Sequence, residues 1–316
     1  MTPSSFAKQL ALLFLLAYIA PTLAQNEESE EAQSDPTWSS PTAQLVEQFW
    51  ELGEPLKRGT FTLRTYRPNY VLPYHYTDSV NQVPNSPTRG EATELPQYED
   101  HEVKIQLSFR TKILEDFFLP NADLWVAYTQ TSLWQAWNSD QSAPFRSTDH
   151  NPDVFYVVPV APNYDIIPGK WRLRMLKVGL AHESNDQSEP LSRSWNYWHV
   201  GGVIQLSNFL FETTYKTRVN EPIDDNDNPD LTNFRGNVES VLTGLFNDTS
   251  VALTRTSPEY SLKKGNWQLD ITHPLIPNKP DGVRVHLQLF SGYGESMIDY
   301  NHKQNRIGIG FVLINI

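Results

Sequence analysis

About twelve short segments with strand-like alternation follow one another after residue 60, and no segment shows a convincing long helical period. Leu124, Val126 and Tyr128 share one parity, and residues 285–289 and 307–313 alternate in the same way. A period of two indicates strands with one apolar face, so the chain is predicted to be all-β. The predicted strands are 67–76, 102–112, 123–132, 154–161, 171–184, 194–207, 209–219, 234–246, 250–256, 266–272, 283–291 and 306–315.

The connections between these strands alternate between long polar loops and tight turns such as Ser207–Asn208 and Asn247–Asp248. Long loops on one rim and short turns on the other are typical of an outer-membrane barrel, and an even strand count places both termini in the periplasm. Nine tryptophans and fourteen tyrosines in a chain that is only 39% hydrophobic fit a surface with two water–lipid interfaces. The prediction is a twelve-stranded antiparallel transmembrane β-barrel, and the alternative is a soluble β-sandwich with an aromatic core.

The chain before the first strand divides into two parts. Residues 1–24 combine Lys8, a short apolar run and small residues up to Ala24, the pattern of a cleaved signal peptide. Residues 25–60 are acidic and form a predicted periplasmic extension, disordered or loosely ordered, with a brief helix near residues 45–52. Residues 61–316 are predicted to form the barrel. A net charge of −12 argues against a nucleic-acid partner, and the absence of cysteine excludes disulfides.

A candidate catalytic pair lies in the strand predicted at residues 171–184. His182 and Ser184 are two residues apart, so they share a face with the apolar stripe of that strand. If this strand and the next form a hairpin with Ser184 opposite Ser194, then His182 lies opposite Asn196. The Asn196 amide would orient the imidazole of His182, which would accept the proton of a Ser184 nucleophile. The alternative is that this His-x-Ser pair arises by chance.

The loop at residues 186–193 is rich in oxygen atoms that could bind a cation. Calcium takes six to eight oxygen ligands, including backbone carbonyls, and would polarise a nearby ester as a Lewis acid. A backbone N–H after Ser184 could stabilise the oxyanion. An acidic loop can also be merely solvated.

Five stretches in the right order resemble a known family. Residues 127–130, 142–146, 182–196, 227–230 and 291–301 are similar to the motifs of outer membrane phospholipase A, the calcium-dependent phospholipase of Gram-negative outer membranes. The resemblance spans residues 60–316. It implies a twelve-stranded barrel with its catalytic site on the outer surface. The implied enzyme is a calcium-bridged homodimer that hydrolyses sn-1 and sn-2 acyl esters of phospholipids and lysophospholipids.

The resemblance also assigns roles to residues of the catalytic centre. Ser184 would be the nucleophile, His182 the base and Asn196 the orienting residue. The family has a glycine where this chain has Asp186, whose backbone N–H would serve the oxyanion. Asp186 could alternatively add a calcium ligand.

The remaining roles that the resemblance implies belong to calcium and to the dimer interface. The calcium ligands would be the Gln187 carbonyl and Ser192 of one chain, with the Ser142 carbonyl of the partner chain. Asp227, with Glu189, matches a region linked to a second calcium site. Gln130 would be an interface residue.

Two alternative functions stay open at this point. The first is a catalytically inactive outer-membrane barrel that acts as a porin or scaffold. The second is a secreted soluble serine esterase built on the β-sandwich.

Overall fold

The computed structural model describes residues 41–93, 95–160, 171–277, 279 and 282–314. The predicted signal peptide and the first part of the acidic extension lie outside the described residues.

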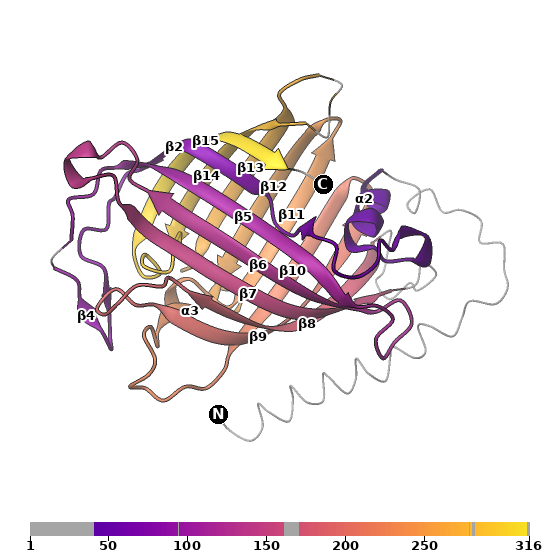
Figure 1. Cartoon of the computed structure of the whole chain (residues 1–316), viewed down its shortest axis with the longest axis horizontal. Coiled ribbons are helices and arrows are strands. Elements are labelled where there is room, and N and C mark those ends of the chain that lie inside the picture. Colours follow the sequence, from indigo (N-terminus) through magenta and orange to yellow (C-terminus); the bar gives the residue numbers. More distant parts are fainter. Residues whose placement is uncertain (1–40, 94, 161–170, 278, 280–281, 315–316) are drawn as a thin grey trace.

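Twelve strands form one closed antiparallel barrel in the described part of the chain (Figure 1). Successive barrel strands pair with one another, and the ring closes where the last strand pairs with the first. The barrel strands are β2 (Asn69–Thr77), β5 (His101–Leu114), β6 (Asp123–Trp134), β7 (Phe145–Pro159), β8 (Arg172–Ser184), β9 (Ser194–Leu206), β10 (Phe209–Arg218), β11 (Val238–Phe246), β12 (Thr249–Ser257), β13 (Asn266–Pro274), β14 (Arg284–Tyr293) and β15 (Lys303–Ile314). The smaller elements are α2 (Pro41–Trp50), η1 (Glu54–Leu56), β1 (Arg64–Thr65), β3 (Asn85–Ser86), β4 (Gly90–Glu91), η2 (Ser139–Gln141), α3 (Leu231–Phe234) and η3 (Pro258–Tyr260).

The two rims of the barrel differ as the sequence predicts. The connections after β2, β6, β8, β10, β12 and β14 lie at one end, which we call the loop rim. The opposite end, the turn rim, holds the two-residue turns at Ser207–Asn208 and Asn247–Asp248. Figure 1 shows α3 and β4 at the loop rim and α2 at the turn rim. The barrel prediction is confirmed, and the β-sandwich alternative is wrong. Among the described residues, no helix has the length and hydropathy to cross a bilayer.

Two predicted strands begin four or more residues away from their positions in the structure. Strand β7 begins at Phe145 rather than at residue 154, because its first half is polar on both faces and lacks the apolar alternation used to find strands. Strand β11 begins at Val238 rather than at residue 234, because residues Leu231–Phe234 form α3. The predicted ends at residues 161 and 315 lie outside the described residues.

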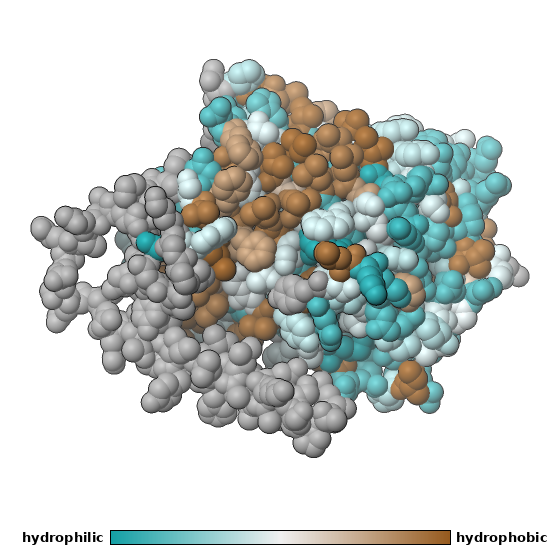
Figure 2. Space-filling model, turned by 180° about the vertical axis from the view of Figure 1, so that it is seen from behind, coloured by the Kyte–Doolittle hydropathy of each residue, from teal (hydrophilic) through white to brown (hydrophobic). Residues whose placement is uncertain are grey.

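The outer face of the barrel is apolar. From Leu176 to the end of β8, and along β9, the even-numbered residues point outward, as the exposure of Leu180 (42%) and Trp198 (54%) indicates, while Ala181 and Tyr197 are buried. Before the register shift between Leu173 and Met175 the parity differs, and Arg174 is buried. Figure 2 shows an apolar band over the strands and a hydrophilic region toward the loop rim. A lipid-facing belt beside a water-facing rim is the surface that an outer-membrane barrel requires.

The lumen is filled mainly by polar and charged side chains. Near the loop rim, Arg146 pairs with Glu102 at 3.0 Å and with Asp299 at 2.7 Å, and all three side chains are buried. Asp299 belongs to the β14–β15 connection, whose Met297 and Tyr300 are also fully buried. This connection therefore folds back into the barrel and occupies its loop-rim end.

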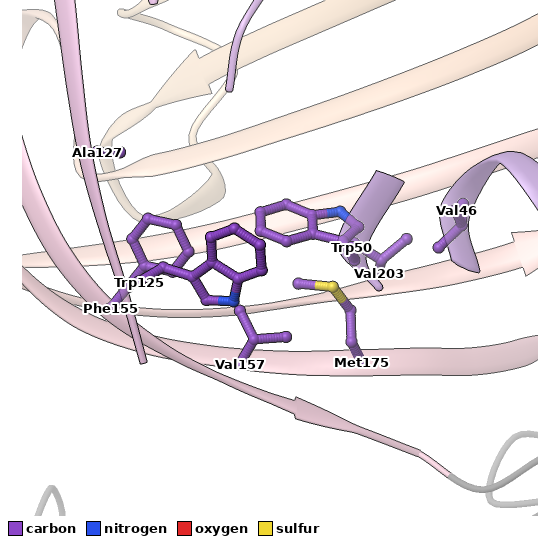
Figure 3. Packing of buried hydrophobic residues seen from close by; sticks show 8 residues of the cluster. All are labelled: Val46, Trp50, Trp125, Ala127, Phe155, Val157, Met175 and Val203. Carbon is purple, nitrogen blue, oxygen red and sulfur yellow. The ribbon is translucent and has the colours of Figure 1, made fainter. Parts of the chain in front are cut away.

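Helix α2 occupies the other end of the lumen. Its Val46 and Trp50 pack against inward-facing side chains of the barrel wall, including Trp125, Phe155 and Met175 (Figure 3). The helix overlaps the one predicted near residues 45–52, but this part of the extension packs against the barrel through Val46 and Trp50 and is not loosely ordered.

Buried ion pairs explain why the acidic composition of this extension was misleading. Glu51 is fully buried and pairs with Arg58 at 2.8 Å and with Lys112 at 3.0 Å, and it also contacts Arg64. Burial by itself raises the pKa of Glu51, but these cationic partners hold it below its ordinary value of 4.5. The carboxylate is compensated inside the barrel instead of being solvated.

A cavity of about 450 Å³ remains in the lumen. Charges of both signs line it, among them Lys177, Glu212, Lys216 and Glu239. Folded segments occupy both ends of the lumen, an arrangement that argues against an open pore.

Strand β2 is irregular at Pro73. The β2–β5 ladder shifts register between Leu72 and His75, and the β2–β15 ladder shifts between Ile309 and Phe311. Proline has no N–H to donate to a ladder, so a bulge at this position is expected.

Candidate active site

The β8–β9 hairpin has the register that the sequence predicts. His182 pairs with Asn196, and Ser184 pairs with Ser194. All four are even-numbered and lie on the outward face, because their odd-numbered neighbours, such as Trp195, are buried inside the barrel. The candidate residues therefore lie on the outer surface at the loop-rim end of the two strands.

A chain of two hydrogen bonds runs through Asn196. The Nδ1 atom of His182 lies 2.9 Å from the Asn196 Oδ1 atom. The Asn196 Nδ2 group donates to Glu221 Oε1 over 2.8 Å. Glu221 lies in the β10–β11 connection, and sequence reasoning missed it because no pattern indicates where a loop residue returns to the sheet.

The backbone at His182 is held from the β7 side by an unusual contact. The β7–β8 register brings Pro152, which has no N–H, to the position opposite His182. The side chain of Asn151 donates to the His182 carbonyl oxygen over 2.7 Å and also to the Tyr197 hydroxyl over 3.1 Å. The asparagine side chain thereby satisfies a carbonyl that proline cannot serve.

Ser184 shares the outward face with His182. Two residues along a strand separate their Cα atoms by about 6.6 Å. Within the described part of the chain, no hydrogen bond joins the Ser184 hydroxyl to the His182 ring. Catalytic hydrogen bonds often tighten only when substrate binds. On the β7 side Ser184 faces His150, whose Nδ1 atom hydrogen-bonds to the Tyr128 hydroxyl.

Gln130 also lies near this face, on β6. Its Nε2 group donates to the Ser132 hydroxyl over 3.2 Å, and its Oε1 atom accepts a long hydrogen bond from Tyr128. Its amide is therefore bonded along its own strand.

The β8–β9 loop is closed by a buried asparagine. The Asn185 N–H donates to the Arg193 carbonyl, and the Arg193 N–H donates to Asn185 Oδ1 over 2.9 Å. The next residue, Asp186, is exposed and has a φ of 47°. This left-handed conformation favours glycine, although aspartate tolerates it better than most residues do. The backbone at the predicted oxyanion position therefore adopts the conformation for which glycine is best suited.

Asp227 gathers three other side chains beside the hairpin. Its Oδ2 atom accepts hydrogen bonds from Ser192 at 2.7 Å and from Ser194 at 3.1 Å, and its Oδ1 atom accepts one from Arg89 at 2.8 Å. Burial raises the pKa of Asp227, but the hydrogen bonds from Ser192 and Arg89 lower it by more. The pKa of Asp227 is therefore below its ordinary value. Arg89, at the turn between β3 and β4, also reaches Glu189 at 3.4 Å.

The other two predicted calcium ligands lie in different loops. Gln187 is half-buried in the same loop as Ser192, whereas Ser142 is exposed in the β6–β7 loop. The structure brings Ser192 to Asp227 but records no contact between Ser142 and either of them among the described residues. Over the same described ranges, there is no cluster of three or more His, Cys, Asp or Glu side chains poised for a metal ion. The candidate ligands are hydroxyl and carbonyl oxygens, a donor type that a hard cation such as calcium accepts.

Comparison with known proteins gives consistent matches. Residues 46–313 match the family described as Phospholipase A1. A putative phospholipase A1 of Neisseria meningitidis serogroup B is 39% identical over 269 residues, which cover 84% of this chain and 68% of that protein. The outer membrane phospholipase A of Escherichia coli superposes with a TM-score of 0.69 at 30% identity, covering 80% of this chain and 94% of that one. The Salmonella typhi outer membrane phospholipase dimer with bound calcium gives a TM-score of 0.72 at 28% identity, with coverage of 85% and 98%.

Proposed function

Because this chain belongs to the phospholipase A1 family and is an outer-membrane phospholipase, we propose that Ser184, His182 and Asn196 form its catalytic triad. The observation that carries this proposal is the 2.9 Å contact between His182 and Asn196 on the lipid-facing side of the barrel, next to a serine on the same face. The substrates are phospholipids and lysophospholipids, and the bonds broken are their sn-1 and sn-2 acyl esters.

Each member of the triad has one task. The Ser184 hydroxyl oxygen attacks the acyl carbonyl carbon while His182 Nε2 accepts its proton. Collapse of the adduct breaks the ester C–O bond, and the leaving glycerol oxygen takes the proton from His182. Water then attacks the acyl-enzyme with His182 again as base, releasing the fatty acid. Asn196 holds the ring orientation, and the backbone N–H of Asp186 donates to the oxyanion.

Calcium fits the oxygen donors near Ser184. The Gln187 carbonyl and Ser192 would bind the ion together with the partner subunit's Ser142, and a bound calcium would polarise the ester carbonyl as a Lewis acid. Asp227 supports this assignment, because its carboxylate accepts a hydrogen bond from the Ser192 hydroxyl and thereby makes the hydroxyl oxygen a better cation ligand. Asp227, with Glu189, belongs to a second calcium site in this proposal.

The active form that we propose is a calcium-bridged homodimer. The Salmonella typhi relative, which is a dimer with bound calcium, supports this assembly. Gln130 lies on the outward face of β6 and would contact the partner. Lipid would enter laterally from the membrane, and separate monomers would be inactive, which protects the cell's own envelope.

The test is fatty-acid release from phospholipid in detergent micelles, with and without a calcium chelator. We expect chelator-sensitive release by the wild type and no release by Ser184→Ala. The heat-modifiable gel mobility of Ser184→Ala should match that of the wild type, which controls for folding. Full activity of Ser184→Ala would refute the assigned nucleophile, and absence of release by the wild type would favour the inactive-barrel alternative.

A further inference from the structure

We propose that Glu221 is a positioning residue of the active site, which fixes the Asn196 amide and, through it, the proton on His182. This inference rests on the proposed function. It extends the triad by a carboxylate that lies outside the sheet and that none of the motifs above contains.

The hydrogen-bonding capacities of the groups determine the orientation of the amide. An ionised carboxylate can only accept, so the atom of Asn196 that faces Glu221 at 2.8 Å must be the NH₂ group. The carbonyl oxygen of the amide must then face His182 at 2.9 Å. A carbonyl only accepts, so Nδ1 of His182 carries the proton and Nε2 is left free to act as the base. One glutamate thereby selects the imidazole tautomer that catalysis needs.

The loop that carries Glu221 is anchored to the same asparagine. The Val219 N–H donates to the Asn196 backbone carbonyl over 2.8 Å, which continues the β9–β10 ladder past its last pair. Arg218 binds the Asn228 carbonyl at 3.0 Å and packs over the Trp195 ring at 5.5 Å. Glu221 therefore has a fixed approach to the amide.

Glu221 also brings a negative charge near the ring. An asparagine orients a histidine but cannot offset the charge of an imidazolium, whereas a carboxylate behind the amide can do so in part. Arg218 Nη1 lies 3.4 Å from the other Glu221 oxygen and weakens the effect.

Other ionisable groups lie on the strands and loops next to the pair. They are His150 on β7, Tyr128 on β6, Asp186 at the end of β8, and Asp227 in the β10–β11 connection. These groups are the same in each variant below, so a difference between variants reports on Glu221.

The experiment compares three variants with the wild type in the micelle assay. Glu221→Gln can still accept from Asn196 but lacks the charge, and Glu221→Ala lacks both. Asp224→Asn removes an equal charge from an exposed position in the same loop and is the matched control. We expect kcat to fall about tenfold in Glu221→Gln and about a hundredfold in Glu221→Ala, at unchanged KM, with Asp224→Asn like the wild type.

The pH profile separates positioning from a purely structural role. Loss of the negative charge makes protonation of the base harder, so the acid limb of kcat/KM should move to lower pH in Glu221→Gln, by about half a unit to one unit. An acid limb at the wild-type pH in both Glu221 variants, together with wild-type kcat, would overturn the proposal.

A spectroscopic measurement keeps the inference testable independently of catalysis. In ¹⁵N-histidine-labelled protein, the His182 signal, identified by its loss in His182→Gln, should show the Nδ1–H tautomer in the wild type and a mixture in Glu221→Ala. An unchanged tautomer in Glu221→Ala would refute the role of Glu221 even if the enzyme is active. A changed tautomer in a protein without lipase activity would support Glu221 and refute the proposed function.

Discussion

Replacing Trp50 with alanine should release helix α2 from the lumen without opening the barrel wall. The Trp50 side chain is 6% exposed, meets the Phe155 ring edge-on with centroids 6.0 Å apart, and lies 4.2 Å from the Arg110 guanidinium. Truncating a buried tryptophan costs about 3–5 kcal/mol. At about 1.4 kcal/mol per factor of ten, the ratio of docked to released helix should fall by at least roughly a hundredfold.

The assay exploits the absence of cysteine from the chain. A single Val46→Cys substitution places a thiol at a position that is 4% exposed on the docked helix, so a maleimide reacts only when the helix is released. When the released helix docks again faster than the maleimide reacts with the thiol, the labelling rate is proportional to the population of released helix. We expect Trp50→Ala to raise that rate by roughly a hundredfold or more.

The control is Leu45→Ala, because Leu45 lies on the same helix and is 49% exposed. Its labelling rate should equal that of the parent, and all variants should keep the heat-modifiable mobility of a folded barrel. Equal labelling rates for Trp50→Ala and Leu45→Ala would refute the view that burial of the indole holds α2 in the barrel.

Three further predictions concern charge, backbone and metal. The pKa of Glu51 is lowered in the folded protein. Its contribution to stability is therefore present above the pKa of the unfolded state and is lost as the pH falls through the pKa of the folded state. In Glu51→Gln, thermal stability should fall less steeply below about pH 4.5 than in the wild type, as measured by the gel mobility of heated samples. Asp186→Gly should retain activity, whereas Asp186→Val, which cannot readily adopt a φ of 47°, should lose it at an unchanged barrel melting temperature; equal activities would argue against an oxyanion role for this backbone. Asp227→Asn should raise the calcium concentration for half-maximal hydrolysis by about 10- to 100-fold, and an unchanged calcium dependence in titrations would separate Asp227 from the metal.

Sequence alone predicted the barrel and the geometry of the hairpin for clear physical reasons. Paired antiparallel positions have residue numbers with a constant sum, so one assumed pair, Ser184 with Ser194, was enough to bring His182 to Asn196. The two-residue period likewise showed which side chains share a face, and the barrel prediction placed the apolar face outward.

The features that the sequence did not predict all depend on contacts between distant segments. The acidic residues near Glu51 were assigned to a disordered or loosely ordered extension because their cationic partners, such as Lys112, lie elsewhere in the chain. The first half of β7 was assigned to a loop because its inward-facing side chains, including Asp149 and Asp153, find polar partners inside the barrel. Glu221 was missed for the same reason, since only the folded β10–β11 connection brings it to Asn196.

The irregular strand at Pro73 has a consequence for assembly. The ring becomes complete only when β15, the last strand made, finds β2, the first, and joining such remote segments carries a large loop-closure entropy. The β2–β15 pairing also contains register shifts, so the strand pair whose formation costs most in entropy has the least regular hydrogen bonding. Strands β2 and β15 should therefore separate first, beginning at Pro73, while the catalytic β8–β9 hairpin stays intact.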